Sequence, residues 1–119
     1  MKKKLETAYG VIGLGRFGEA LAMMLAKSGN EVIVVDKDEK KVKEMRQYTD
    51  CAFVTDDLSA DTLKEIGIQN CDVVIICIGE KVDVSVLTTM SVIELGVPRV
   101  IAKALSPEQG AVLEKIGAE

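Results

Sequence analysis

The residues best placed to do chemistry are three glycines in a G-x-G-x-x-G spacing, Gly13, Gly15 and Gly18. An apolar run over 9–12 precedes them, and a helix-like run over 17–27 follows. In this setting the first glycine permits a tight turn out of a strand, and the second lets a pyrophosphate approach the backbone. The third allows the helix to lie close against the sheet. The free N–H groups at the helix start then face the phosphates.

A carboxylate stands where the second apolar run ends, at Asp36. An acid at such a strand end accepts hydrogen bonds from both hydroxyls of an adenosine ribose and would repel a 2′-phosphate. We therefore predict NAD(H) or ATP/ADP as the cofactor rather than NADP(H), with Lys37 as the nearby cation that would soften this preference. The alternative is a glycine turn with a purely structural role, which the strand, helix, strand and terminal acid together disfavour.

Other candidate cofactor-binding residues lie in the glycine loop or follow later strands. Arg16 can place its guanidinium on phosphate oxygens; its alternative is a solvated surface arginine. The remaining candidates are Leu14, Phe17, Lys37, Asp56, Asp57, Cys77, Ile78, Gly79 and Lys103.

Four of these candidates have plain alternatives. Asp56 and Asp57 would bond an adenine edge or a ribose, but aspartate after a strand is also ordinary turn chemistry. Lys103 faces the crevice side or simply extends along the surface. Cys77 fits a buried, inert thiol better than a redox sensor. We predict neither a catalytic residue nor a metal site.

The composition limits the function. The 119 residues make one domain, 1–119, and 48 % are apolar, which argues against disorder. A net charge of −4 argues against nucleic-acid binding. We find neither a signal-peptide core nor a run of about 18 apolar residues, and three cysteines fit a reducing compartment, so we expect a cytoplasmic protein. The chain has no histidine, the commonest general base, which argues against an enzyme.

Apolar runs alternate with helical patterns along the whole chain. This alternation predicts an α/β fold, a Rossmann-like doubly wound parallel sheet of five strands in the order 3-2-1-4-5. A sixth strand is expected after 117–119, where the chain stops. Expected strands are 9–12, 31–36, 51–54, 72–78 and 99–102, and expected helices are 17–27, 39–48, 59–66, 82–95 and 106–116.

The helix over 82–95 carries two apolar stripes. We expect the broader one to pack on the sheet; it comprises Val82, Val86, Leu87, Met90 and Ile93. The second comprises Val84, Thr88, Val92 and Leu95. A helix on one side of a sheet needs a single apolar face, so the second stripe requires another partner. That partner is either a neighbouring helix of the same chain or a second subunit.

Four segments resemble the RCK/KTN family, the cytosolic regulatory domains of potassium channels and of Trk/Ktr potassium transporters. They are VIGLGRFG at 11–18, LTT at 87–89, ELGVP at 94–98 and LEKIGA at 113–118. The resemblance spans nearly the whole chain, and the later segments are more specific than the glycine loop.

The resemblance implies a Rossmann lobe that binds NAD(H) or ATP/ADP and self-associates to gate a membrane potassium channel or transporter. It implies a phosphate loop at Gly13, Gly15 and Gly18, a phosphate-facing Arg16 and a ribose acid at Asp36. The final strand, crossover helix and C-terminal ligand lobe of that family are missing from the sequence. The alternative function is the cofactor half of an NAD-dependent oxidoreductase. A P-loop ATPase is excluded because no G-x-x-x-x-G-K-[ST] occurs.

Overall fold

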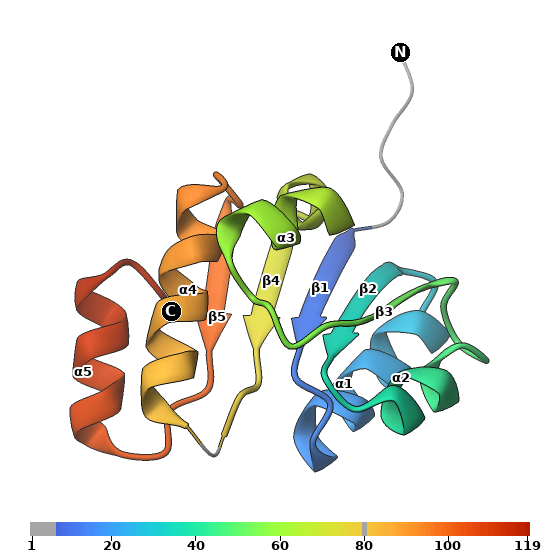
Figure 1. Cartoon of the computed structure of the whole chain (residues 1–119), viewed down its shortest axis with the longest axis horizontal. Helices are drawn as coiled ribbons and strands as arrows, with labels where there is room; N and C mark the ends of the chain where they lie inside the picture. The colour runs from blue at the N-terminus through green and yellow to red at the C-terminus, as the bar shows by residue number, and fades with distance from the viewer. Residues whose placement is uncertain (1–6, 80) are drawn as a thin grey trace.

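A five-stranded parallel sheet forms the centre of the computed structural model, which describes residues 7–79 and 81–119 (Figure 1). The strand order β3-β2-β1-β4-β5 confirms the predicted topology. The strands are β1 (Ala8–Ile12), β2 (Glu31–Asp36), β3 (Cys51–Val54), β4 (Val73–Ile76) and β5 (Arg99–Ala102). The helices are α1 (Arg16–Lys27), α2 (Glu39–Met45), α3 (Ala60–Ile66), the 3-10 turn η1 (Ile68–Asn70), α4 (Val82–Glu94) and α5 (Pro107–Lys115).

Both faces of the sheet are covered, which is why its strands are apolar on both sides. In β1, Val11 belongs to a buried cluster with residues of α1 and α2, whereas its neighbour Ile12 belongs to one with residues of α3 and α4. The register sets Val11 beside Val34 and Ile75. Because all strands are parallel, their carboxyl ends meet at one edge, where the glycine turn lies.

Side-chain caps fix the starts of three helices. Asp38 accepts the Lys40 N–H at 3.0 Å to begin α2, and Ser59 caps α3. Ser106 accepts the Gln109 N–H at 3.1 Å to begin α5, as its sequence suggests. The structure shortens the predicted helix over 39–48, since α2 ends at Met45 and the chain then turns toward β3.

The last residue lies against the free edge of β5. The Glu119 N–H donates to the Val100 carbonyl at 2.8 Å, and the Ala102 N–H donates to the Glu119 carbonyl at 3.0 Å. The Glu119 carboxylate also meets the Arg99 guanidinium at 2.8 Å and 3.2 Å. This pairing lies where the sequence places a sixth strand.

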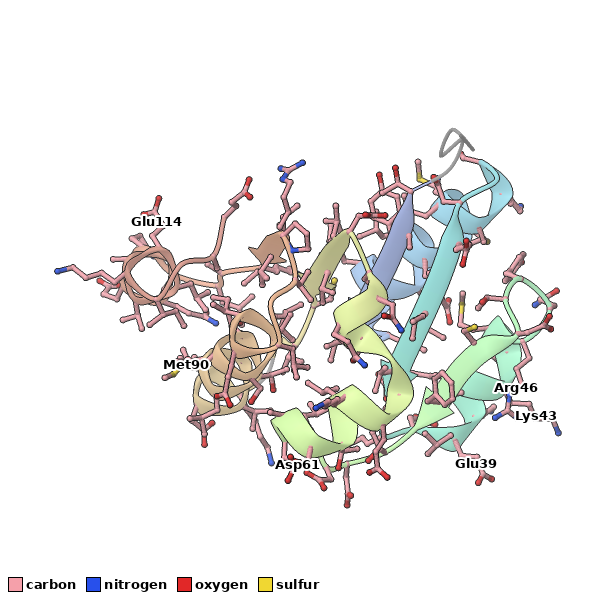
Figure 2. The ribbon with its side chains drawn as sticks, turned by 90° about the horizontal axis from the view of Figure 1, so that it is seen from above. Glu39, Lys43, Arg46, Asp61, Met90 and Glu114 are labelled. Atoms are coloured by element: carbon pink, nitrogen blue, oxygen red, sulfur yellow. The ribbon has the colours of Figure 1, made fainter. Side chains whose placement is uncertain are left out.

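The prediction for the two faces of α4 was wrong. Leu87 and Met90, assigned to the sheet, are 62 % and 49 % exposed, and Met90 projects away from the sheet (Figure 2). Thr88 and Val92 are buried, although they belong to the stripe expected to contact either a neighbouring helix of the chain or a second subunit. Small residues line this inner face, so the helix approaches the sheet and its neighbouring helices closely. The distribution of apolar residues along the helix did not reveal which face is buried.

None of the described helices is long and apolar enough to cross a bilayer.

This orientation predicts opposite outcomes for two single substitutions on α4. Val92→Glu places an unpaired carboxylate in a fully buried site and should destabilise the fold by several kcal/mol. Leu87→Glu changes a solvent-facing position and should leave the circular dichroism spectrum unchanged. Thermal unfolding followed by circular dichroism compares the two. If Val92→Glu stays folded and Leu87→Glu unfolds, Leu87 faces the sheet, as the sequence suggested, and the orientation described here is wrong.

Candidate functional site

A cleft of about 600 Å³ opens at the carboxyl edge of the sheet. Its wall includes 13 of the 14 residues predicted as cofactor-binding, and Asp57 is the exception. The predicted residues in the wall are Gly13, Leu14, Gly15, Arg16, Phe17, Gly18, Asp36, Lys37, Asp56, Cys77, Ile78, Gly79 and Lys103. Sequence reasoning missed Ile12, Val35, Asp38, Lys41, Thr55, Leu58, Lys81 and Val84.

The three glycines of the loop meet three different requirements. Gly13 has a φ of 102°, and a Cβ there would also lie 2.9 Å from the Cys77 carbonyl oxygen. A Cβ on Gly18 would collide with the Gly13 carbonyl oxygen. No heavy atom lies within 4 Å of the position that a Cβ on Gly15 would occupy. Gly13 and Gly18 therefore serve the packing of the fold, while Gly15 leaves open space inside the cleft.

Helix α1 begins in the cleft with its donors unused. Gly15 is its N-cap and supplies no side chain, and the first helical hydrogen bond runs from the Glu19 N–H to the Gly15 carbonyl at 2.9 Å. The N–H groups of residues 16–18 consequently have no helical acceptor. Three free donors and the positive end of the helix dipole form a site for an anion such as a phosphate.

Backbone donors hold the Asp36 carboxylate at the other side of the loop. Its Oδ2 accepts the Leu14 N–H at 2.6 Å, and its Oδ1 accepts the Asp38 N–H at 2.8 Å. The glycine turn and the end of β2 thus orient the same carboxylate. Each oxygen keeps a second acceptor position, which suits a pair of neighbouring hydroxyl groups.

Positive charge gathers in the cleft of a chain whose net charge is −4. Its wall holds five cationic side chains and three carboxylates; the cations are Arg16, Lys37, Lys41, Lys81 and Lys103. The ion pair found in residues 7–79 and 81–119 is that of Arg99 with Glu119, and neither residue belongs to the cleft wall. The cleft cations therefore remain available to an anionic ligand.

Lys41 and Lys81 escaped prediction for a physical reason. Lysines near the start of a helix are typical of a solvated outer face, and neither follows a strand directly. Only the approach of α2 and α4 to the cleft brings them in. A signal was present for Lys41, since it lies in the first turn of the helix that follows Asp36.

The Lys103 ammonium lies over the Phe17 ring, 5.3 Å from its centroid. Its backbone N–H donates to the Ile76 carbonyl at 3.0 Å, which continues the pairing of β5 with β4. Nearby, burial raises the pKa of the Cys77 thiol to about 11, and the Lys103 charge opposes part of this shift. Cys77 is thus a neutral thiol at physiological pH, in agreement with an inert wall residue.

Asp57 is occupied by turn chemistry instead of facing the cleft. Its Oδ2 accepts the Thr62 hydroxyl at 2.6 Å and its Oδ1 accepts the Ser59 N–H at 3.0 Å. The Thr62 hydrogen bond, followed by that of Ser59, lowers the pKa of this carboxyl. Asp56 lines the cleft and keeps its candidate role. In residues 7–79 and 81–119, no group of three or more acidic or cysteine side chains is arranged to hold a metal ion.

A doubly wound parallel sheet with a glycine turn, an uncapped helix and a strand-end acid defines a Rossmann-type nucleotide-binding fold. Residues 9–119 match the TrkA-N domain. The chain belongs to the TrkA-N domain family, which confirms the resemblance drawn from its sequence segments.

Two relatives are potassium uptake proteins of Bacillus subtilis (strain 168). The chain is 41 % identical to Ktr system potassium uptake protein C over 119 residues, which are 100 % of this chain and 52 % of that protein. It is 39 % identical to Ktr system potassium uptake protein A over 111 residues, 93 % of this chain and 50 % of that protein. The chain thus spans about half the length of these relatives.

Three solved structures share the fold. The TrkA-N domain of inner membrane protein ybaL from Escherichia coli has a TM-score of 0.83 at 18 % identity, over 98 % of this chain and 87 % of that one. The GsuK channel bound to NAD has a TM-score of 0.79 at 23 % identity, over 100 % of this chain and 21 % of that one. GsuK bound to ADP has a TM-score of 0.76 at 25 % identity, over 95 % of this chain and 29 % of that one.

Two glycine-to-alanine variants should separate folding from binding. Gly18→Ala forces a methyl group onto the Gly13 carbonyl and should cost about 1–3 kcal/mol of unfolding free energy. Gly15→Ala fits the extended backbone of that residue, with a φ of −67°, and should cost less than about 1 kcal/mol while it weakens binding of ADP or NADH. Urea unfolding and calorimetry measure the two effects. Unchanged affinity in a folded Gly15→Ala variant would contradict a phosphate at this glycine.

Proposed function

We propose that this chain is the nucleotide-sensing lobe of a regulator that gates a potassium channel or transporter, with NAD(H) or ATP/ADP as its ligand. The observation that carries the proposal is the uncapped N-terminus of α1 facing the oriented Asp36 carboxylate across one cationic cleft. Phosphates fit the first and ribose hydroxyls fit the second. Asp56, where the cleft wall follows β3, is an acceptor for the adenine amino group.

A regulatory role is favoured over catalysis by the chemistry of the cleft wall. The chain has no histidine, and the Cys77 thiol is neutral. Tyr9 and Tyr48 line a separate groove with the amino-terminal ends of β1 and β2, so they supply no tyrosine acid to the cleft. These features argue against the cofactor half of an NAD-dependent oxidoreductase, in which an acid–base pair must reach the nicotinamide.

The partner and the location of the protein follow from its relatives. The two Bacillus subtilis proteins are named as parts of Ktr potassium uptake systems, and GsuK is named as a channel. By analogy, the chain acts on the cytoplasmic side of a membrane potassium transporter or channel and is held at the membrane through that partner. The half of the relatives that this chain does not span would complete the regulator.

The direct test of the proposed ligand uses the protein as purified. Mass spectrometry of material released by denaturation should identify an adenine nucleotide, and calorimetry should show binding of ATP, ADP or NADH tighter than that of NADPH. Asp36→Ala should weaken NADH binding by about 1–3 kcal/mol, because hydrogen bonds to a charged group are lost. NADPH binding at least as tight as that of NADH would refute the role of Asp36 at the ribose.

Self-association is the second part of the proposal, on the outer rather than the inner face of α4. This face comprises Val82, Leu87 and Met90, which are 48 %, 62 % and 49 % exposed. The adjacent helix α5 adds Val112 at 46 %. Rows of large exposed apolar side chains are uncommon on monomers, whereas single ones are ordinary. A second copy of this chain would cover them.

A double variant on α4 and a single control variant on α1 test this surface. Met90→Glu combined with Leu87→Glu should convert a dimer into a folded monomer in sedimentation velocity, because two buried carboxylates would oppose association. Met24→Glu is the matched control, since Met24 is 64 % exposed on α1, which covers the other face of the sheet. If the control dissociates the dimer and the double variant does not, the interface lies on α1.

A further inference from the structure

An exposed phenylalanine in a glycine loop requires an explanation, and the contact with Lys103 provides one. Phe17 is 50 % exposed although it lies in the first turn of α1, beside the free N–H donors. Its ring carries the Lys103 ammonium at 5.3 Å. A carboxylate partner would neutralise that cation, whereas an aromatic face positions it and leaves its charge intact. Lys103 has no ion-pair partner among residues 7–79 and 81–119.

Three observations place the Lys103 side chain, which is itself exposed, along the wall of the cleft. The residue lines the cleft wall. Its backbone is fixed by the hydrogen bond to the Ile76 carbonyl at 3.0 Å. Its side chain meets the ring of Phe17, which contributes one of the free N–H donors of α1. The ammonium therefore stands at the phosphate loop, on the side opposite Asp36.

The described carboxylates of the cleft wall all lie on one side of it, where Lys37 and Lys41 accompany them. These carboxylates come from the ends of β2 and β3 and are Asp36, Asp38 and Asp56. The described charged residues from the β4 and β5 side are Lys81 and Lys103. A nucleotide whose ribose lies at Asp36 and whose phosphates lie at α1 would extend its distal group toward these lysines.

We propose, on the basis of the proposed nucleotide site, that Lys103 held by Phe17 selects ligands by the charge of the group beyond the shared phosphates. An anionic terminal phosphate gains from the ammonium, and a neutral dihydronicotinamide is tolerated. The cationic nicotinamide ring of oxidised NAD is repelled. Lys103 is thus a specificity-determining residue, and Phe17 is a positioning residue that acts through it.

The test compares four ligands across matched variants of the full chain. Calorimetry at low ionic strength measures ATP, ADP, NADH and NAD⁺ with wild type, Lys103→Gln, Lys103→Arg, Phe17→Leu and Lys115→Gln. Lys115 ends α5 outside the cleft wall, so its variant makes the same change in net charge away from the ligand.

Lys103→Gln should weaken the binding of ATP about tenfold and the binding of ADP and NADH by less. The affinity for NAD⁺ should stay unchanged or increase, so the ratio of the NADH affinity to the NAD⁺ affinity should fall. Phe17→Leu should shift the four affinities in the same order by a smaller factor, Lys103→Arg should restore them, and Lys115→Gln should change none. The proposal would be overturned if Lys103→Gln lowered the affinity for all four ligands equally, or if Lys115→Gln lowered the affinities by the same factors. If wild type binds none of the four, the proposed function fails first; if it binds and the losses are equal, only the role of Lys103 fails.

Discussion

The close approach of α1 to the ends of β1 and β4 is the constraint on which the rest of the structure depends. Gly13 and Gly18 bring the helix start, the turn and the backbone of Cys77 so near one another that a single methyl group would not fit at either glycine. This packing fixes where the free N–H groups of α1 point. It also sets Leu14 where its own N–H reaches Asp36. Fold stability and ligand geometry therefore share the same few atoms.

The distribution of charge around the cleft follows from that geometry more than from the composition of the chain. An acidic protein would repel a nucleotide on approach, yet the cleft collects five cationic side chains, none of which forms an ion pair within the part of the chain that the structure describes. Backbone donors rather than lysines hold Asp36, and an aromatic ring rather than an acid holds Lys103. Each charged group is oriented without being neutralised, and this is what a site needs if binding is to vary with ligand charge.

The sequence could predict the sheet order and most of the candidate cleft wall, because strand ends, glycine spacing and caps are local signals. It failed where tertiary context decides. The buried face of α4 comprises Ser85, Thr88, Thr89 and Val92, and an apolar count passes over the small polar residues Ser85 and Thr89. Asp56 was the better candidate because it lies nearer to β3, but only the hydrogen bonds of Asp57 to Thr62 and Ser59 show that Asp57 belongs to a turn. Lys41 and Lys81 enter the cleft through the placement of their helices.

The two proposed surfaces share one element, α4. The first turn of this helix, with Lys81 and Val84, belongs to the cleft wall, while Leu87 and Met90 lie one to two turns further on its exposed side. A helix transmits displacement along its axis because each turn is hydrogen-bonded to the next. A ligand that draws Lys81 toward its phosphates would thus displace the same rigid unit that carries the apolar face. Coupling between nucleotide and subunit contact then requires no further moving part, only two arrangements of α4 with different affinities for the ligand.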